Sequence, residues 1–217
     1  MALSVLSRAQ YLTAPVGGMR GPDHDALVMV KAVKGLSFNN YATMQIGGQW
    51  VRIEEATKDR ALDWFAEWAA PHVIDISGPK ILVPVPSSKT TLTSPADFRT
   101  AVIANKVAAL CPGTVVAPVL RFKAARANSR DEGGSRSPQV IYSELALNGQ
   151  LPAGRIILVD DVLTGGGHLK ASAWILEDNG RTVEHALACG RTLGTQQPDP
   201  FNLPVETIDL SRTSVFG

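Results

Sequence analysis

The residues with the clearest chemical potential are two adjacent carboxylates followed by a run of three glycines. Asp160 and Asp161 come directly after the apolar run Ile156–Val159, which is typical of a strand buried on both faces of a parallel sheet. The small residues after them expose backbone N–H groups, and the helix expected next adds partial positive charge, so this turn is suited to binding an anion such as phosphate. The anion-binding segment is Thr164, Gly165, Gly166, Gly167 and His168.

Two carboxylates beside a phosphate site present an electrostatic conflict, because they would repel the ligand. The conflict disappears if Asp160 and Asp161 contact hydroxyl groups or a metal-bound oxygen while the glycines hold the phosphate. A ribose 5-phosphate carries a diol at one end and a phosphate at the other. The spacing therefore predicts a sugar-phosphate site.

The same residues resemble the signature of type I phosphoribosyltransferases: an apolar strand, two acidic residues, two apolar residues and then Thr-x-Gly-x. The chain departs from that signature at Gly167, where the family often has Thr. The resemblance covers about residues 75–215. It implies that Asp160 and Asp161 hold the ribose hydroxyls of phosphoribosyl pyrophosphate (PRPP), directly or through Mg²⁺, as catalytic residues and metal ligands. It also implies that the segment from Thr164 to His168 binds the 5-phosphate.

Other interpretations of this segment stay open. An Asp-Asp pair after an apolar strand also occurs in receiver domains, although there it lies near the N-terminus and no glycine loop follows. The glycine spacing matches neither the Rossmann nor the P-loop pattern. A purely structural strand–turn–helix needs only one glycine. His168 is either a phosphate donor or a solvent-facing residue of the first helical turn.

A second polar segment follows the apolar run Ile81–Pro86. Ser87, Ser88 and Lys89 place hydroxyls, backbone donors and one cation at the expected end of a strand. The resemblance implies that this is the pyrophosphate loop, and the alternative is a solvated loop lysine. The preceding Val-Pro-Val-Pro also resembles ComF-type competence proteins.

A third polar segment, residues 121–138, is long and irregular, which in a compact domain indicates a functional or a disordered loop. Its charged residues are the basic Arg121, Lys123, Arg126, Arg130 and Arg136 and the acidic Asp131 and Glu132. The resemblance implies a mobile loop that closes over PRPP, with Arg126 and Arg130 as catalytic residues and Arg121 and Lys123 as substrate ligands. Guanidinium groups would stabilise the charge of the departing pyrophosphate. The alternative is a solvated loop without a ligand.

Composition limits the functional classes. The chain has 217 residues, of which 45% are hydrophobic and 19% charged, so it can bury a full core. A net charge of +1 argues against a nucleic-acid partner. Cys111 and Cys189 are too few and too far apart to indicate a zinc ribbon or a disulfide scaffold. The sequence shows no signal peptide and no membrane-spanning run, so we expect a cytoplasmic protein without a membrane partner.

The expected fold is α/β, a type I phosphoribosyltransferase-like parallel sheet flanked by helices (residues 76–217), with an N-terminal α+β hood (residues 1–75). We expect the aromatic residues Trp64, Phe65 and Trp68 to pack in the core, the alternative being a base-stacking surface. In the N-terminal part we expect a partly regular segment at Met1–Asp25, a strand or helix at Ala26–Val33 and a hairpin at Tyr41–Ile53. The expected helices are Glu54–Ala70 (ended by Pro71), Pro95–Leu110 and His168–Asn179. The expected strands are Ile81–Pro86, Val115–Leu120, Gln139–Leu145, Ile156–Val159, Val183–Cys189 and Val205–Leu210.

The leading hypothesis is a Mg²⁺-dependent enzyme that transfers ribose 5-phosphate from PRPP to a nucleobase-like acceptor and releases pyrophosphate, with a homodimer expected from the resemblance. The alternative is a catalytically silent PRPP- or nucleotide-binding regulatory protein. A partner-binding competence or defence accessory rests only on the Val-Pro-Val-Pro similarity.

Overall fold

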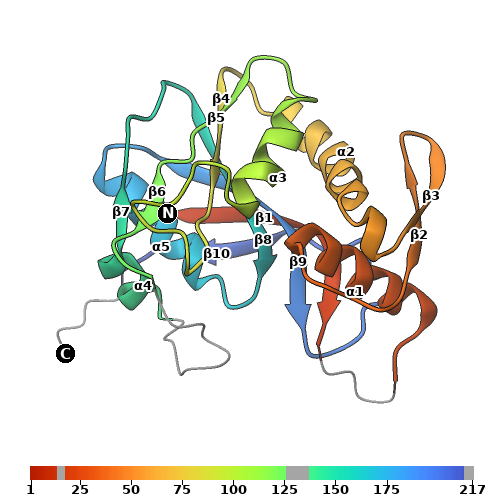
Figure 1. Cartoon of the computed structure of the whole chain (residues 1–217). Coiled ribbons are helices and arrows are strands. Elements are labelled where there is room, and N and C mark those ends of the chain that lie inside the picture. The colour runs from red at the N-terminus through yellow and green to blue at the C-terminus, as the bar shows by residue number, and fades with distance from the viewer. Residues whose placement is uncertain (14–17, 126–136, 213–217) are drawn as a thin grey trace.

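A six-stranded sheet lies at the centre of the protein (Figure 1). The computed structural model describes residues 1–13, 18–125 and 137–212. Adjacent strands of the sheet are parallel except the edge strand β10, which is antiparallel to β1. The expected α/β fold is therefore confirmed, with a central sheet that is mostly rather than wholly parallel. In spatial order the strands are β10 (Glu206–Asp209), β1 (Ala2–Leu12), β9 (Val183–Leu193), β8 (Arg155–Leu163), β4 (Lys80–Pro84) and β5 (Thr114–Val116).

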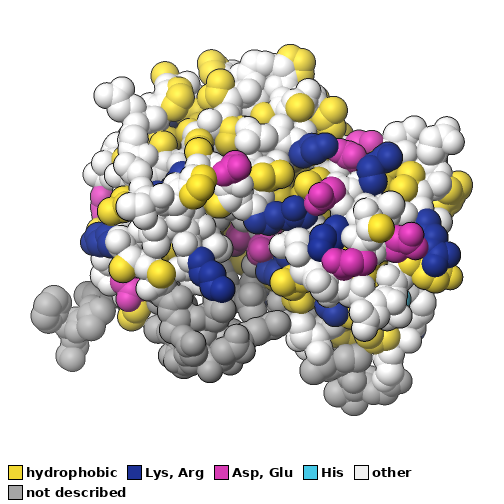
Figure 2. Space-filling view, in the orientation of Figure 1, with side chains coloured by type: hydrophobic (Ala, Val, Ile, Leu, Met, Phe, Trp, Pro, Cys, Tyr) yellow, Lys and Arg dark blue, Asp and Glu magenta, His cyan; other side chains and the backbone are white. Residues whose placement is uncertain are grey.

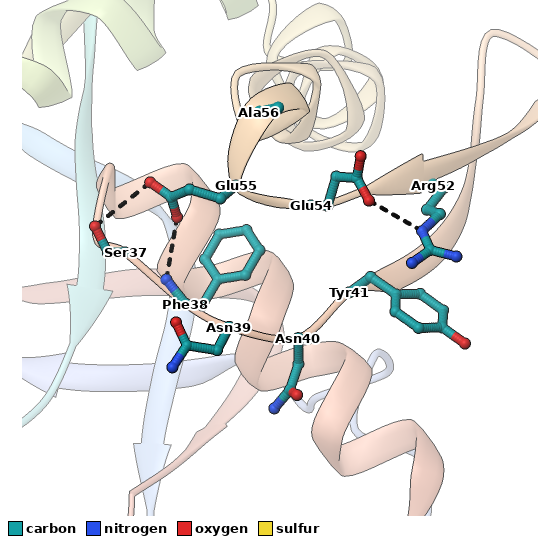
Figure 3. A pocket seen from close by; sticks show the side chains of 9 residues that line it. All are labelled: Ser37, Phe38, Asn39, Asn40, Tyr41, Arg52, Glu54, Glu55 and Ala56. Atoms are coloured by element: carbon teal, nitrogen blue, oxygen red, sulfur yellow. Dashed lines mark hydrogen bonds and ion pairs between the residues drawn. The ribbon is translucent and has the colours of Figure 1, made fainter.

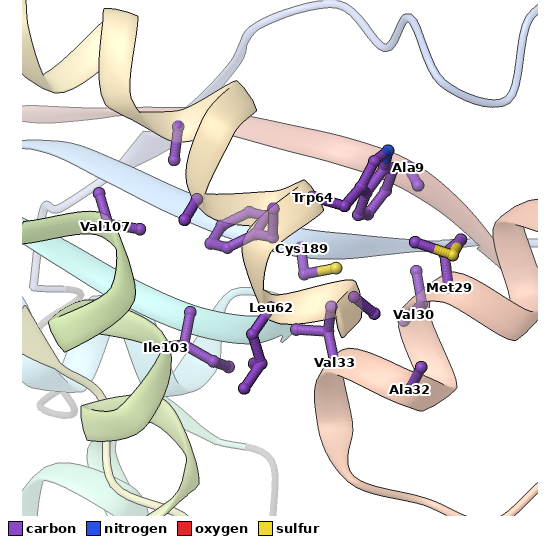
Figure 4. Packing of buried hydrophobic residues seen from close by; sticks show 14 of the residues in the cluster. Ala9, Met29, Val30, Ala32, Val33, Leu62, Trp64, Ile103, Val107 and Cys189 are labelled. Carbon is purple, nitrogen blue, oxygen red and sulfur yellow. The ribbon is translucent and has the colours of Figure 1, made fainter. Parts of the chain in front are cut away.

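Helices cover both faces of the sheet. One face packs against α1 (Gly21–Lys34), α2 (Arg60–Ile74) and α3 (Arg99–Ala108), and Figure 4 shows their apolar side chains meeting around Cys189 of β9. The other face packs against α5 (Gly167–Asp178), whose Leu169, Ala173 and Leu176 are fully buried. Among the described residues, no helix is long and apolar enough to cross a membrane.

The N-terminal segment is more regular than expected. Residues Met1–Asp25 were expected to be only partly regular, but they include the whole of β1, which lies inside the central sheet between β9 and β10. The segment 1–75 therefore contributes a strand to the same sheet as the segment after residue 76. Ala26–Val33, which the pattern left open between strand and helix, lies within α1.

The hairpin is confirmed, and it consists of β2 (Ala42–Ile46) and β3 (Gln49–Ile53). A short 3-10 helix, η1 (Glu55–Thr57), leads into α2. The expected stop at Pro71 is wrong, since Pro71 lies inside α2 and its carbonyl accepts the N–H of Asp75 at 3.0 Å. Trp64 and Phe65 are buried and Trp68 packs against the same core, so the aromatic stripe is core packing.

The middle of the chain departs most from the expected elements. The strand expected at Val115–Leu120 is divided into β5 and β6 (Leu120–Phe122), and β6 pairs with β7 (Leu145–Leu147) in a separate two-stranded sheet. The strand expected at Gln139–Leu145 is instead the helix α4 (Pro138–Glu144). Pro138 at the start of α4 has the fixed φ that favours a first helical residue, so a helix signal was present in the sequence.

Candidate functional site

The parallel strands β4 and β8 bring two of the predicted site segments together. Their register pairs Pro84 with Val159, and Val85, the residue after β4, donates its N–H to the Val159 carbonyl at 2.9 Å. Asp160 follows Val159 directly, so the Ser87–Lys89 loop and the acidic pair lie on neighbouring strands near the same edge of the sheet. This carboxyl edge is where open α/β sheets bind ligands.

Asp160 lies inside β8 rather than after it, because β8 extends to Leu163. It is opposite Ala188 of β9, is 9% exposed, and accepts a hydrogen bond from the Asp161 N–H at 2.8 Å. Burial, and after it the negative charge of Asp161, raise the pKa of Asp160 to about 7, and Lys34 opposes the shift. Burial and the neighbouring carboxylate thus favour the protonated form of Asp160.

Asp161 forms an ion pair with Lys34, the last residue of α1, at 3.0 Å between Nζ and Oδ1. Successive strand residues point to opposite faces, so Asp161 shares the face of Ile157 and Val159, which α1 covers, whereas Asp160 shares the face of Leu158. Sequence reasoning missed Lys34, which is 127 residues from Asp161. No local signal distinguishes it from other lysines near a helix end.

The glycine loop, residues 164–167, leads from the end of β8 into the first residue of α5, Gly167. Gly166 caps α5 with a φ of 75°, in the left-handed region that favours glycine, and a Cβ there would lie 2.8 Å from Cδ1 of Ile208. A Cβ on Gly165 would meet no atom within 4 Å. The loop therefore leaves open space beside Gly165 at the N-terminus of a twelve-residue helix.

Arg191 of β9 contacts the first residue of the glycine loop, Thr164, through a hydrogen bond. Its Nη1 donates to the Thr164 carbonyl, and its Nε forms an ion pair with Glu206 of β10 at 2.7 Å. In a trans peptide the C=O and the following N–H point in opposite directions. The N–H of Gly165 consequently points away from Arg191. Sequence reasoning missed Arg191, whose role depends on the pairing of β8 with β9.

The loop after β4 is a tight turn. The Ser87 and Thr90 hydroxyl oxygens are 2.9 Å apart, and the Thr90 N–H donates to the Ser87 carbonyl at 2.8 Å. Ser88 is half-buried beside them, and Lys89 is exposed. The His168 ring, in the first turn of α5, lies 6.0 Å from the Phe122 ring, centroid to centroid.

Arg121 and Lys123 lie on either side of Phe122, whose N–H donates to the Thr90 carbonyl of the β4 loop at 2.9 Å. Arg121 is only 4% exposed, stacks 4.6 Å from the Phe98 ring centroid, and donates to the Leu120 carbonyl at 2.8 Å. Lys123 donates to the Ser143 carbonyl at 2.7 Å. Both side chains thus stabilise the local fold. Arg126 and Arg130 lie outside the described residues.

The acidic pair offers the hard oxygen donors that Mg²⁺ prefers, but few of them. Within residues 1–13, 18–125 and 137–212, no group of three or more His, Cys, Asp or Glu side chains could hold a metal ion. Mg²⁺ is commonly held by one or two carboxylates together with substrate phosphates and water. Asp160 and Asp161 fit an ion that arrives with a phosphorylated substrate, and Lys34 already contacts one oxygen of Asp161.

A separate cavity of about 530 Å³ lies in the N-terminal segment, and its first lining residue, Ser37, follows Lys34 by three positions in the sequence. Figure 3 shows the Phe38 ring in the middle of its lining and the Tyr41 ring beside the Arg52 guanidinium, which is 3.8 Å from the ring centroid. None of the predicted site residues that the structure describes lines it. The lining residues are Ser37, Phe38, Asn39, Asn40, Tyr41, Arg52, Glu54, Glu55 and Ala56.

Charges of both signs alternate on the surface over α1, α2 and α3 (Figure 2). They form ion pairs such as Lys106–Asp63 at 2.8 Å and Arg99–Asp59 at 3.3 Å. This face therefore presents mixed charge.

Comparison with known proteins identified distant structural neighbours. No family model matches the chain, and no curated protein matches it. An adenine phosphoribosyltransferase from Thermoanaerobacter pseudethanolicus is 14% identical, with 70% of this chain and 95% of that chain covered and a TM-score of 0.39. The Trypanosoma brucei adenine phosphoribosyltransferase, in complex with AMP, pyrophosphate and ribose-5-phosphate, is 10% identical over 81% and 84%, with a TM-score of 0.41. The Giardia lamblia enzyme with 9-deazaadenine is 15% identical over 80% and 98%, with a TM-score of 0.37.

Proposed function

We propose that the protein is a phosphoribosyltransferase, which transfers ribose 5-phosphate from PRPP to a nucleobase-like acceptor and releases pyrophosphate. The observation that carries this proposal is the order of groups along one strand and one turn. Two carboxylates at the end of β8 are followed by a glycine turn that caps α5. These groups match the diol and the phosphate of a ribose 5-phosphate, and their pattern resembles the family signature.

In this proposal each segment has a distinct task. Asp160 and Asp161 accept hydrogen bonds from the ribose hydroxyls and fix the orientation of the sugar. The N–H groups of the glycine loop, with the α5 dipole behind them, bind the 5-phosphate. Ser87, Ser88 and Lys89 bind the pyrophosphate from the neighbouring strand β4. Holding both ends of the sugar positions its anomeric carbon for the acceptor.

Mg²⁺ would be held by the pyrophosphate and by the carboxylate oxygens of Asp160 and Asp161. When bound, it would neutralise charge on the leaving group. The chain's own contribution on that side is the basic segment after β6, in which Arg126 and Arg130 would stabilise the leaving pyrophosphate.

The acceptor is expected in the cavity that follows Lys34. The exposed Tyr41 ring would stack on a planar acceptor, and Asn39 and Glu54 would contact polar groups at its edge. Replacing Tyr41 with Ala should then raise the KM for the acceptor and leave the affinity for PRPP unchanged. An unchanged acceptor KM would place the acceptor elsewhere.

A regulatory protein that binds PRPP without turnover is the second candidate. This candidate is favoured by the positions of Arg121 and Lys123, whose side chains donate to backbone carbonyls of the protein itself. In that case the phosphate and ribose contacts would be retained, and the basic side chains needed for pyrophosphate departure would not act.

Measuring pyrophosphate release from PRPP with Mg²⁺, with and without a pooled set of purine and pyrimidine bases, separates the two candidates. Release that depends on a base supports the transferase, and dividing the pool identifies the acceptor. Binding of PRPP without release supports the regulatory protein. Absence of PRPP binding would contradict both.

A further inference from the structure

Asp160 and Asp161 lie beside the proposed phosphate site and would repel an anionic ligand. The ion pair between Lys34 and Asp161 reduces this negative charge. A sugar phosphate that places its hydroxyls on Asp160 and Asp161 brings its own negative charge toward two carboxylates. At short range, like charges in a partly buried site repel strongly. A cation held beside the pair would reduce this repulsion.

The Lys34–Asp161 pair is more enclosed than a typical surface ion pair. The Lys34 side chain is 23% exposed and that of Asp161 is 26% exposed, whereas in the Arg52–Glu54 pair the values are 59% and 48%. Enclosure reduces screening by water and salt, so the charge of Lys34 acts on Asp161 more strongly than it would in an exposed pair. The ammonium contacts Oδ1.

Several contacts fix the end of α1 that carries Lys34. The Arg99 guanidinium donates to the Val33 carbonyl at 2.5 Å and to the Ala32 carbonyl at 2.7 Å, so it caps the helix C-terminus. Gly35 then ends the helix with a φ of 76°. Because its backbone is held on both sides, Lys34 is presented to Asp161 by the fold.

We propose that Lys34 is a positioning residue of the sugar-phosphate site, whose ammonium neutralises and orients Asp161 so that an anionic sugar can bind beside two carboxylates. This inference rests on the proposed function and adds to it a residue outside the motif. One oxygen of Asp161 faces Lys34, and the second oxygen serves a ribose hydroxyl. Lys34 acts through Asp161.

The test uses three variants of the full chain: Lys34→Met, which removes the charge and keeps most of the stem, Lys34→Arg, which keeps the charge, and Lys31→Met. Lys31 lies in the same last turn of α1, so its replacement changes the net charge equally and serves as the matched control. Calorimetry measures the affinity for ribose 5-phosphate in EDTA. A second titration measures the affinity for Mg²⁺ alone, and thermal melting verifies the fold.

We expect Lys34→Met to weaken ribose 5-phosphate binding roughly tenfold, with Lys34→Arg and Lys31→Met within about twofold of the wild type. The uncovered carboxylates should attract cations, so Lys34→Met should bind Mg²⁺ about tenfold more tightly than the wild type. A loss of packing alone would not increase Mg²⁺ affinity. Wild-type affinity of Lys34→Met for ribose 5-phosphate would overturn the proposal.

The Mg²⁺ titration tests the role of Lys34 independently of sugar-phosphate binding. If the wild type does not bind ribose 5-phosphate, the proposed function fails, and the Mg²⁺ result decides the role of Lys34. Tighter Mg²⁺ binding by Lys34→Met would then support its role as the counter-charge of the acidic pair. Unchanged Mg²⁺ affinity would refute that role.

Discussion

The backbone of Gly190 in β9 lies so close to Val30 of α1 that a Cβ on Gly190 would be 2.7 Å from Cγ1 of Val30. The same Cβ would be 3.0 Å from Cγ2 of Val162 in β8. The missing side chain therefore lets α1 approach the strand that carries the acidic pair. Lys34 lies about one helical turn after Val30, so this approach helps to bring it to Asp161.

The first prediction follows from that contact. Gly190→Ala should lower the free energy of unfolding by about 1–3 kcal/mol, because the added methyl group overpacks a filled core and shifts α1. Urea denaturation measures the change, and Gly165→Ala, whose Cβ faces open space, is the matched control. A Gly190→Ala protein as stable as the wild type would show that α1 is not constrained at this point.

The second prediction concerns the glycine loop. Gly166→Ala should lose about 1 kcal/mol or more of stability, since φ is 75° and the new Cβ would press on Ile208. Gly165→Ala should keep wild-type stability and weaken phosphate binding, because its Cβ enters the space proposed for the ligand. Melting curves and calorimetry with ribose 5-phosphate test both changes. Unaltered binding by Gly165→Ala would mean that the ligand does not occupy that space.

The third prediction is a pH dependence of stability that originates at Asp160. Its pKa in the folded protein is raised to about 7, mainly by burial, above the ordinary value of 3.8. The folded state therefore binds more protons than the unfolded state between these values, and the contribution of Asp160 to stability falls as pH rises from about 4 to about 7. Asp160→Asn removes this penalty, so it should stabilise the protein at pH 8 by about 2–4 kcal/mol and have little effect near pH 4.

Urea denaturation of the wild type and Asp160→Asn at several pH values measures this difference. The gap between the two proteins should widen with increasing pH up to about 7 and then stay constant. A gap that is independent of pH would contradict the assignment of a protonated Asp160.

The strands of the sheet and the site motif could be predicted because each is marked by residues that lie close together in the sequence. Four consecutive apolar residues, Ile156–Val159, indicate a strand buried on both faces, and the carboxylates and glycines follow in the same short stretch. The extension of β8 through Asp160 and Asp161 was not predictable. It depends on pairing with Ala188 and Gly190 of β9, which are distant in sequence.

Other differences have the same origin in long-range contacts. In β1, polar residues interrupt the apolar pattern, but Gln10 is buried because its side chain bonds to the backbone of Thr195 and Gln197. In α2, Pro71 removes a single donor near the end of the helix, and the burial of Val73 offsets that loss. Lys34 and Arg191 reach the site through contacts with Asp161 and Thr164, which are distant from them in sequence.

The most direct test of the central claim is the affinity for PRPP of the wild type and of Asp161→Asn, measured by calorimetry with Mg²⁺ present. Asp63→Asn, which alters the ion pair between Asp63 of α2 and Lys106 of α3, is the control for the loss of one carboxylate. We predict that the wild type and Asp63→Asn bind PRPP equally and that Asp161→Asn binds about tenfold or more weakly, with a cooperative melting transition showing that the variant still folds. Equal binding of PRPP by Asp161→Asn and the wild type would contradict a sugar site built on this acidic pair.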